Sequence, residues 1–201
     1  MSDEQKKQLE QQLWNIANTL RGKMDADEFR DYILGFIFFK YLSERMHTHA
    51  NEILAQDEIQ YTELNETTPD GIEILEAVKK DSLLKLGYFL KPSELFSVIA
   101  AKGNSKAEDE NAEVQSNFIL QELADILKHI EQSTLGTESE DDFGNLFDEL
   151  DLTSVKLGKT VKERNTIISK VLSHLDKIDF ELQNANSDVL GDAYEYLIAQ
   201  F

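Results

Sequence analysis

The sequence predicts a mainly α-helical protein, a compact domain of several helices around one core. Only two prolines and nine glycines occur in 201 residues, so few positions would interrupt a helix. In several long stretches, apolar side chains recur every three or four residues, which is the spacing of one face of a helix. Hydrophobic residues make up 41% of the chain, enough to form a core.

The first fifty residues predict two helices joined by a short basic turn. The first helix should begin near Ser2 and end at Arg21 and Gly22, a cation followed by a residue that tolerates positive φ. The second should begin at Asp25, because Glu28 stands three residues later and completes a capping box.

This second helix, predicted over residues 25–54, is apolar on nearly every side. Such a helix is usually buried from several directions. It also contains Gly35, which costs about 1 kcal/mol relative to alanine inside a helix. We therefore expect another helix to approach closely at Gly35.

The rest of the chain predicts shorter elements joined by polar segments. In order, we expect a short helix over 72–80, an extended segment over 87–90, a helix from Pro92 to Ala101, a polar loop over 102–111, a helix over 114–132, an irregular acidic stretch over 135–158, a helix from Thr160 to about Lys177, and a last helix from residue 187 or 188. The extended segment is either an isolated strand or a length of chain held against helices. The acidic stretch should contain one short buried turn, formed by Phe143, Leu146, Phe147 and Leu150.

Charge is distributed unevenly along the chain. The net charge is −19, of which residues 1–56 carry −2 and residues 57–201 carry −17. Because DNA affinity depends largely on lysine and arginine contacts to phosphates, the acidic part should be repelled by DNA. Only the N-terminal quarter is expected to approach it.

Composition also bears on location. The chain has no cysteine, which fits a reducing compartment, and its polar start lacks the apolar core of a secretory signal. The most apolar segment, residues 32–42, is too short for a membrane span. We expect a cytoplasmic protein with no membrane partner.

Signatures of catalysis and metal binding are missing from the sequence. It contains neither of the two glycine-rich nucleotide-binding motifs, G-x-G-x-x-G and G-x-x-x-x-G-K-[ST]. Its four histidines are scattered, so we expect them to be solvated or at helix ends. The acidic run ESEDDFG does not match a calcium loop, and no nucleophile motif occurs. We therefore expect no metal site and no enzymatic activity from this chain alone.

Nucleic-acid or partner binding is the remaining possibility, and it is confined to the two N-terminal helices. Cations beside aromatic rings can contact phosphates. The alternative is that these cations only neutralise neighbouring acidic residues at the helix ends. The candidate contacts are Trp14, Arg21, Lys23, Arg30, Lys40 and Tyr41.

Three segments resemble a known family. LWNIANTLRG with EFRDYILGFIFFKYLSERM, then LGYFLKPSELF, then SDVLGDAYEYLIAQF are similar, in the same order, to the DNA-methylation subunit of type I restriction-modification systems. The resemblance implies an adenine-N6 methyltransferase that uses S-adenosylmethionine. It also implies partners: a specificity subunit, a second methylation subunit, a restriction subunit, and DNA in the assembled complex.

The family's cofactor-binding and catalytic motifs do not occur in these residues, so no such residue can be assigned. The resemblance identifies residues 1–186 as the helical N-terminal domain and residues 187–201 as the start of the linker or first helix of a methyltransferase domain. The helical pattern still runs at Phe201, so we expect a piece of a longer protein. The predicted function is to assist subunit assembly and closure around DNA.

Two other functions remain open from the sequence. One is a purely structural protein–protein docking module without DNA contact, anchored by Trp14 and Tyr41. The other is a stand-alone short protein that inhibits the complete complex by occupying a partner's site.

Overall fold

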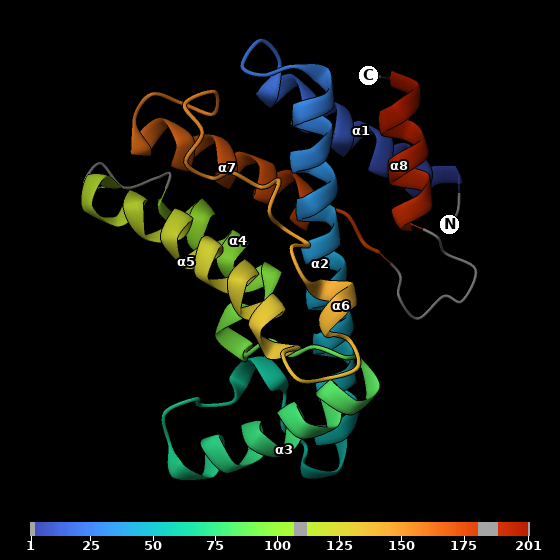
Figure 1. Ribbon diagram of the computed structural model, residues 1–201, viewed down its shortest axis with the longest axis vertical. Coiled ribbons are helices and arrows are strands. Elements are labelled where there is room, and N and C mark those ends of the chain that lie inside the picture. The colour runs from blue at the N-terminus through green and yellow to red at the C-terminus, as the bar shows by residue number, and fades with distance from the viewer. Residues whose placement is uncertain (1–2, 107–111, 181–188, 201) are drawn as a thin grey trace.

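Helix α2, residues Ala26–Leu54, runs the length of the molecule, and the other helices gather around it (Figure 1). The computed structural model describes residues 3–106, 112–180 and 189–200. The remaining helices are α1 (Asp3–Leu20), α3 (Pro69–Lys85), α4 (Phe96–Lys106), α5 (Ala112–Ser133), α6 (Glu140–Phe143), α7 (Val161–Asp176) and α8 (Val189–Gln200), with short 3₁₀ turns at Ala55–Asp57, Tyr61–Glu63 and Pro92–Glu94. No strand occurs in these ranges, so the predicted mainly α-helical class is confirmed.

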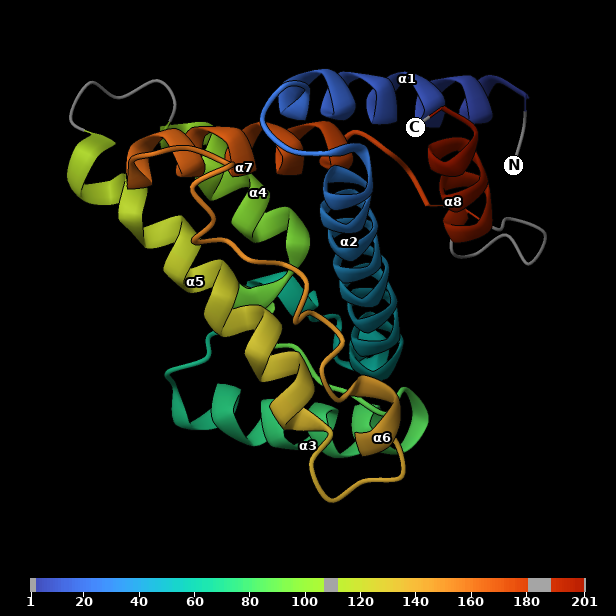
Figure 2. The ribbon, with the colours of Figure 1, turned by 45° about the horizontal axis from the view of Figure 1, so that its top comes forward.

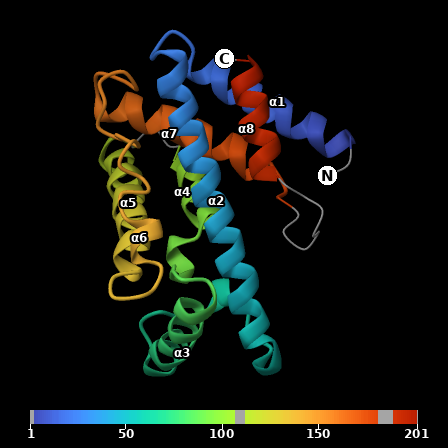
Figure 3. The ribbon, with the colours of Figure 1, turned by 45° about the vertical axis from the view of Figure 1, so that its right-hand side comes forward.

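The helices form two groups at the ends of α2. Helices α1 and α7 cross one end, and α3 lies across the other (Figure 2). Helix α7 packs against α1, α4, α5 and α2, so it joins the N-terminal pair to the middle of the chain. Helix α8 lies against α1 and α2 (Figure 3).

Helix α2 begins as the sequence predicts and is buried from several directions. The Asp25 backbone N–H donates to Glu28 Oε2 at 3.1 Å, as in a capping box. Ser2 lies outside the described residues. Buried apolar side chains occur along the whole length of α2: Phe29, Tyr32, Ile33, Phe36, Ile37, Phe39, Leu42, Met46, Ala50 and Leu54.

Gly35 marks a close approach, but the neighbour is not the helix that we expected. A Cβ atom at Gly35 would lie 2.7 Å from Leu150 Cδ1, 2.8 Å from its Cγ and 2.9 Å from its Cδ2. Leu150 belongs to the irregular stretch after α6 and is buried, as is Phe147 in the same predicted turn. The acidic stretch therefore covers α2 with its few apolar side chains.

The segment over 87–90 is extended and held by helices, without strand pairing. Tyr88, Phe89 and Leu90 are all buried. The Tyr88 hydroxyl donates to the Leu42 carbonyl at 2.7 Å, and the Phe89 N–H donates to Ser133 Oγ at 3.0 Å. The second contact satisfies a backbone N–H of the extended segment that a sheet would otherwise have to pair.

Two predicted helix boundaries are wrong. Helix α3 begins at Pro69, because the Thr68 hydroxyl accepts a hydrogen bond from the Gly71 N–H at 3.2 Å and caps an earlier turn. Ile72, where the sequence predicts that the helix begins, lies within α3 and is 49% exposed.

The second error concerns the segment after Pro92. Pro92 opens only a 3₁₀ turn, and α4 begins at Phe96 and continues to Lys106. Residues 102–106 are therefore helical, and only residues 107–111 of the predicted loop lie outside the described ranges. A Cβ at Gly103 would come within 2.8 Å of Ile119 Cδ1 and 3.1 Å of Ser169 Oγ. This packing among α4, α5 and α7 extends a helix whose composition resembles a loop.

The last predicted helix is present as α8, and only some of its apolar side chains are covered. Ala193 and Leu197 are buried, whereas Tyr194 is 52% and Ile198 50% exposed. The assignment of residues 187–201 to a following domain stays a prediction.

The contact at Gly35 predicts that the effect of Gly35→Ala on the stability of the fold depends on the residue at position 150. Gly35→Ala should disfavour folding in the parent chain, because the new methyl group overlaps the buried Leu150 side chain. In a Leu150→Ala background the overlap is gone, so the same change should be neutral or stabilising through the alanine helix propensity. We expect a coupling free energy of about 1–3 kcal/mol from urea unfolding of the four chains. Equal effects of Gly35→Ala in both backgrounds would contradict this account.

Candidate functional site

The turn between α1 and α2, residues 21–25, carries two exposed cations and is called the α1–α2 corner below. Gly22 adopts φ +76°, which allows the chain to leave α1 and enter α2 within a few residues. The Arg21 guanidinium carbon lies 5.1 Å from the centre of the Trp14 ring, a cation–π contact. Arg21 and Lys23 are exposed, and Trp14 is partly buried.

The corner is joined to a segment more than a hundred residues away. The Lys156 ammonium forms an ion pair with Glu28 in the first turn of α2. Hydrogen bonding to Glu28 raises the pKa of Lys156, and the same bond lowers the pKa of Glu28. Sequence reasoning missed Lys156, because it lies in the part of the chain that is acidic on average.

The six predicted contact residues do not form one cluster. Trp14, Arg21 and Lys23 lie at or beside the corner, and Arg30 is partly buried in the second turn of α2. Tyr41 lies about 24 Å from Asp25, the last residue of the corner, along the axis of α2 at 1.5 Å per residue. It stacks on Phe38, with ring centres 6.2 Å apart.

Lys40 is a correction to the predicted set, because its side chain lies inside the protein. It is 4% exposed and forms an ion pair with Glu44. Its ammonium is 5.5 Å from the centre of the Phe96 ring and 4.9 Å from that of Phe180. A lysine held in this way connects α2 to α4 and to the chain after α7, and is not available to DNA or a partner.

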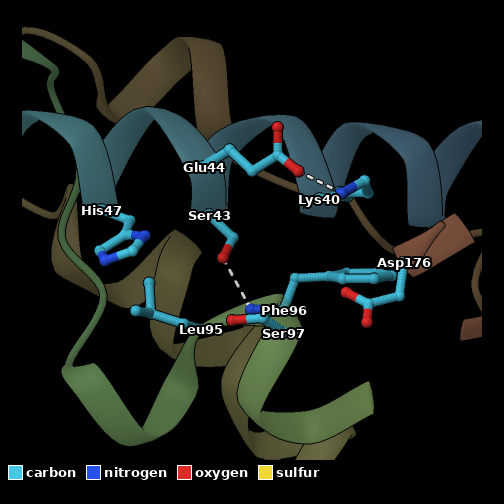
Figure 4. A pocket seen from close by; sticks show the side chains of 8 residues that line it. All are labelled: Lys40, Ser43, Glu44, His47, Leu95, Phe96, Ser97 and Asp176. Atoms are coloured by element: carbon cyan, nitrogen blue, oxygen red, sulfur yellow. Dashed lines mark hydrogen bonds and ion pairs between the residues drawn. The ribbon is translucent and has the colours of Figure 1, made fainter. Parts of the chain in front are cut away.

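A small polar pocket lies beside Lys40, between α2, the start of α4 and the end of α7 (Figure 4). Its volume is about 40 Å³, room for little more than water. The Phe96 N–H donates to Ser43 Oγ at 2.7 Å and fixes the start of α4 against α2. The lining residues are Lys40, Ser43, Glu44, His47, Leu95, Phe96, Ser97 and Asp176.

Two titratable groups in this pocket are perturbed by their surroundings. Burial raises the pKa of the Glu44 carboxyl above its ordinary 4.5, while the Lys40 charge opposes the shift and Asp176 and Asp179 add to it. Burial lowers the pKa of His47 below 6.5. The pocket is therefore a small polar site between packed helices, with the dimensions of a water site.

The four histidines are each partly buried, and not solvated as expected. His174 does lie in the last turn of α7. Three of the four have polar partners: His49 Nε2 with Asp81 Oδ2 at 2.9 Å, His129 Nδ1 with Glu94 Oε2 at 2.8 Å, and His174 Nδ1 with Gln12 Oε1 at 3.1 Å. Among the described residues, no group of three metal-ligating side chains occurs, and no helix is long and apolar enough to cross a membrane.

The raised pKa of Glu44 predicts a specific pH dependence of stability. The folded protein binds this proton more tightly than the unfolded chain, so the contribution of Glu44 is fully present below about pH 4.5 and is lost as the pH rises through the raised pKa. Because glutamine cannot ionise, Glu44→Gln should gain stability relative to the parent between pH 4 and pH 7. Urea unfolding across this range measures the difference.

The control for this prediction is Glu52→Gln, which alters an exposed glutamate on the same helix. Glu44→Gln also removes the partner of Lys40, which shifts the free energy of unfolding by a similar amount at every pH. The readout is therefore how the difference in free energy of unfolding between variant and parent changes with pH. A Glu44→Gln curve that stays parallel to the parent curve would refute the assignment.

Comparisons with known proteins agree on one family. The family model for the HsdM N-terminal domain matches residues 9–175. The type I restriction enzyme MpnII methylase subunit of Mycoplasma pneumoniae is 33% identical over 98% of this chain. The crystal structure of the type I restriction-modification system methyltransferase subunit from Streptococcus thermophilus has a TM-score of 0.72 and 30% identity over 97% of this chain.

The match covers only part of each relative. This chain spans 35% of the length of the Mycoplasma protein and 38% of the Streptococcus chain. The sequence resemblance, the family model and the helical fold lead to the same conclusion: the chain belongs to the HsdM N-terminal domain family.

Proposed function

We propose that this chain is the helical N-terminal domain of a type I adenine-N6 DNA methyltransferase subunit, and that it helps the subunits assemble and close around DNA. The observation that carries the proposal is the exposed pair of cations at the α1–α2 corner, Arg21 and Lys23, in a domain whose relatives are methylase subunits. Residues 57–201 carry a net charge of −17, so DNA would be repelled from most of the remaining surface.

The proposed partners are those of a type I system: a specificity subunit, a second methylation subunit and a restriction subunit. The complete protein would use S-adenosylmethionine as the methyl donor. The family's cofactor-binding and catalytic motifs do not occur in this sequence. We therefore assign no step of methyl transfer to this chain.

Charge reversal at the two corner cations and at Arg30, in the second turn of α2, tests the proposal, and this triple variant is called the corner variant below. The triple variant Arg21→Glu, Lys23→Glu, Arg30→Glu, made in the complete methylation subunit, should weaken DNA binding at low salt or impair subunit assembly. For every phosphate that the variant no longer neutralises, the slope of log affinity against log salt should also fall by about 0.9. Mobility-shift titrations over a salt series and gel filtration measure the two effects.

The matched control is Lys80→Glu, Lys128→Glu, Lys170→Glu, which changes the net charge equally at three exposed lysines elsewhere. A thermal melt of both variants separates a binding defect from unfolding. If the corner variant folds, assembles and binds DNA as well as the control, the proposal fails.

The second candidate function is a docking module without DNA contact. Trp14 and Tyr41 are partly buried aromatic side chains, the type that commonly anchors protein interfaces. On this alternative, Trp14→Ala and Tyr41→Ala should weaken assembly, whereas the corner variant should leave the DNA affinity of the assembled complex unchanged. Deleting residues 1–50 cannot make this distinction, because it removes most of α2 and with it the core.

A further inference from the structure

One short segment of the acidic region is basic. Residues 154–164, called the basic segment below, contain four cations and a single acidic residue, Glu163, for a net charge of +3. The cations are Lys156, Lys159, Lys162 and Arg164. This local positive charge is not apparent from the net charge of residues 57–201, which is −17.

Folding brings the basic segment to the α1–α2 corner. Lys156 is ion-paired with Glu28, at the start of α2. Glu163 has a lowered pKa, mainly through its hydrogen bonds in the α7 cap, and Lys23 lies close enough for its charge to contribute. The loop before α7 passes beside the turn between α1 and α2 in Figures 1 and 2. Two groups of cations separated by about 130 residues therefore share one end of the molecule.

The segment is held in a defined conformation. Leu157 is fully buried, and the Arg164 guanidinium donates to the Gly158 carbonyl at 3.0 Å. A Cβ at Gly158 would lie 2.5 Å from Glu163 Cβ, so the loop packs directly on the first turn of α7. The Glu163 N–H donates to Thr160 Oγ1 at 3.1 Å, which caps that helix.

Three of the four cations of the basic segment are exposed: Lys156 in the loop, and Lys159 and Lys162 around the start of α7. Arg21 and Lys23 at the corner are exposed as well. Residues 21–30 and 154–164 together have a net charge of +3, so the rest of the chain carries −22. The basic segment supplies this net positive charge, because the three cations of residues 21–30 are balanced by three acidic residues, and the remainder of the domain is strongly anionic.

We propose that the basic segment and the α1–α2 corner form a single surface that binds the phosphate backbone of DNA. This inference rests on the proposed function and adds a second, distant segment to its DNA-facing surface. Lysines are depleted in the cores of protein interfaces, whereas lysine and arginine neutralise DNA phosphates. The anionic remainder is repelled by DNA, so the domain meets the duplex with this end only.

Charge reversal within the basic segment tests the inference. The double variant Lys159→Glu, Lys162→Glu is made in the complete methylation subunit, assembled with its specificity partner. Its matched control is Lys80→Glu, Lys128→Glu, which changes the net charge equally on α3 and α5. Both new glutamates lie near the N-terminal end of α7, where negative charge favours the helix, so the fold should be retained.

We expect the double variant to bind duplex DNA roughly ten- to a hundredfold more weakly than the control at about 0.1 M salt, with a salt slope shallower by about 1.8. Lys159→Gln, Lys162→Gln should give a smaller loss in the same direction. Equal affinities and slopes for the double variant and its control would overturn the inference. A variant that fails to assemble with its partner would also overturn it, because the surface would then be a protein interface.

The variant at Arg21, Lys23 and Arg30 distinguishes failure of the inference about the basic segment from failure of the proposed function. If that variant weakens DNA binding and the Lys159, Lys162 variant does not, the proposed function stands and the basic segment is excluded from the surface. If neither variant changes DNA binding or assembly, both proposals fall.

Discussion

Burial of α2 along its whole length is the constraint on which the rest of the structure depends. A helix that is apolar on nearly every side cannot face water, so each neighbouring element has to cover part of it. Phe96 of α4 packs on Phe39 with ring centres 5.4 Å apart. The extended segment contributes the Tyr88 hydroxyl, bonded to the Leu42 carbonyl, and the acidic stretch contributes Leu150 over Gly35. Segments with little helical periodicity of their own are ordered because their apolar side chains are buried against α2.

The charged groups follow from the same constraint. Lys40 falls on a side of α2 that α4 covers, so its ammonium has to be satisfied inside the protein, by Glu44 and the faces of Phe96 and Phe180. The cations of the α1–α2 corner lie beyond the end of the buried helix and stay in solvent. Position relative to the core, and not residue type, therefore decides which cations can meet a partner.

The uneven distribution of charge over the domain determines which part of it can face DNA. An acidic protein is ordinarily repelled by DNA, but here residues 21–30 and 154–164, which lie side by side, together carry a net charge of +3. A domain with this distribution can be drawn to a duplex at one end while its other faces remain turned away. That property supports the proposed role of a module that contributes to a complex around DNA.

The sequence by itself determined the helical class and most of the helices, because caps and apolar spacing act within a few residues. Asp25 with Glu28, and Thr160 with Glu163, placed the starts of α2 and α7 correctly. The resemblance, carried by three segments in order, identified the family that the comparisons then showed. The α1–α2 corner was also visible, since Arg21, Gly22 and Lys23 are adjacent.

Tertiary structure alone decided what depends on distant contacts. Adjacent on one helix, Lys40 and Tyr41 looked equivalent as surface candidates, and only packing of α4 against α2 buried the lysine. The continuation of α4 to Lys106 depends on the fit of Gly103 against α5 and α7. Lys156 gained its place beside Glu28 through a pairing across 128 residues that no local pattern records. Short-range rules could define the elements, but only the assembled core determined which side chains remained on the surface.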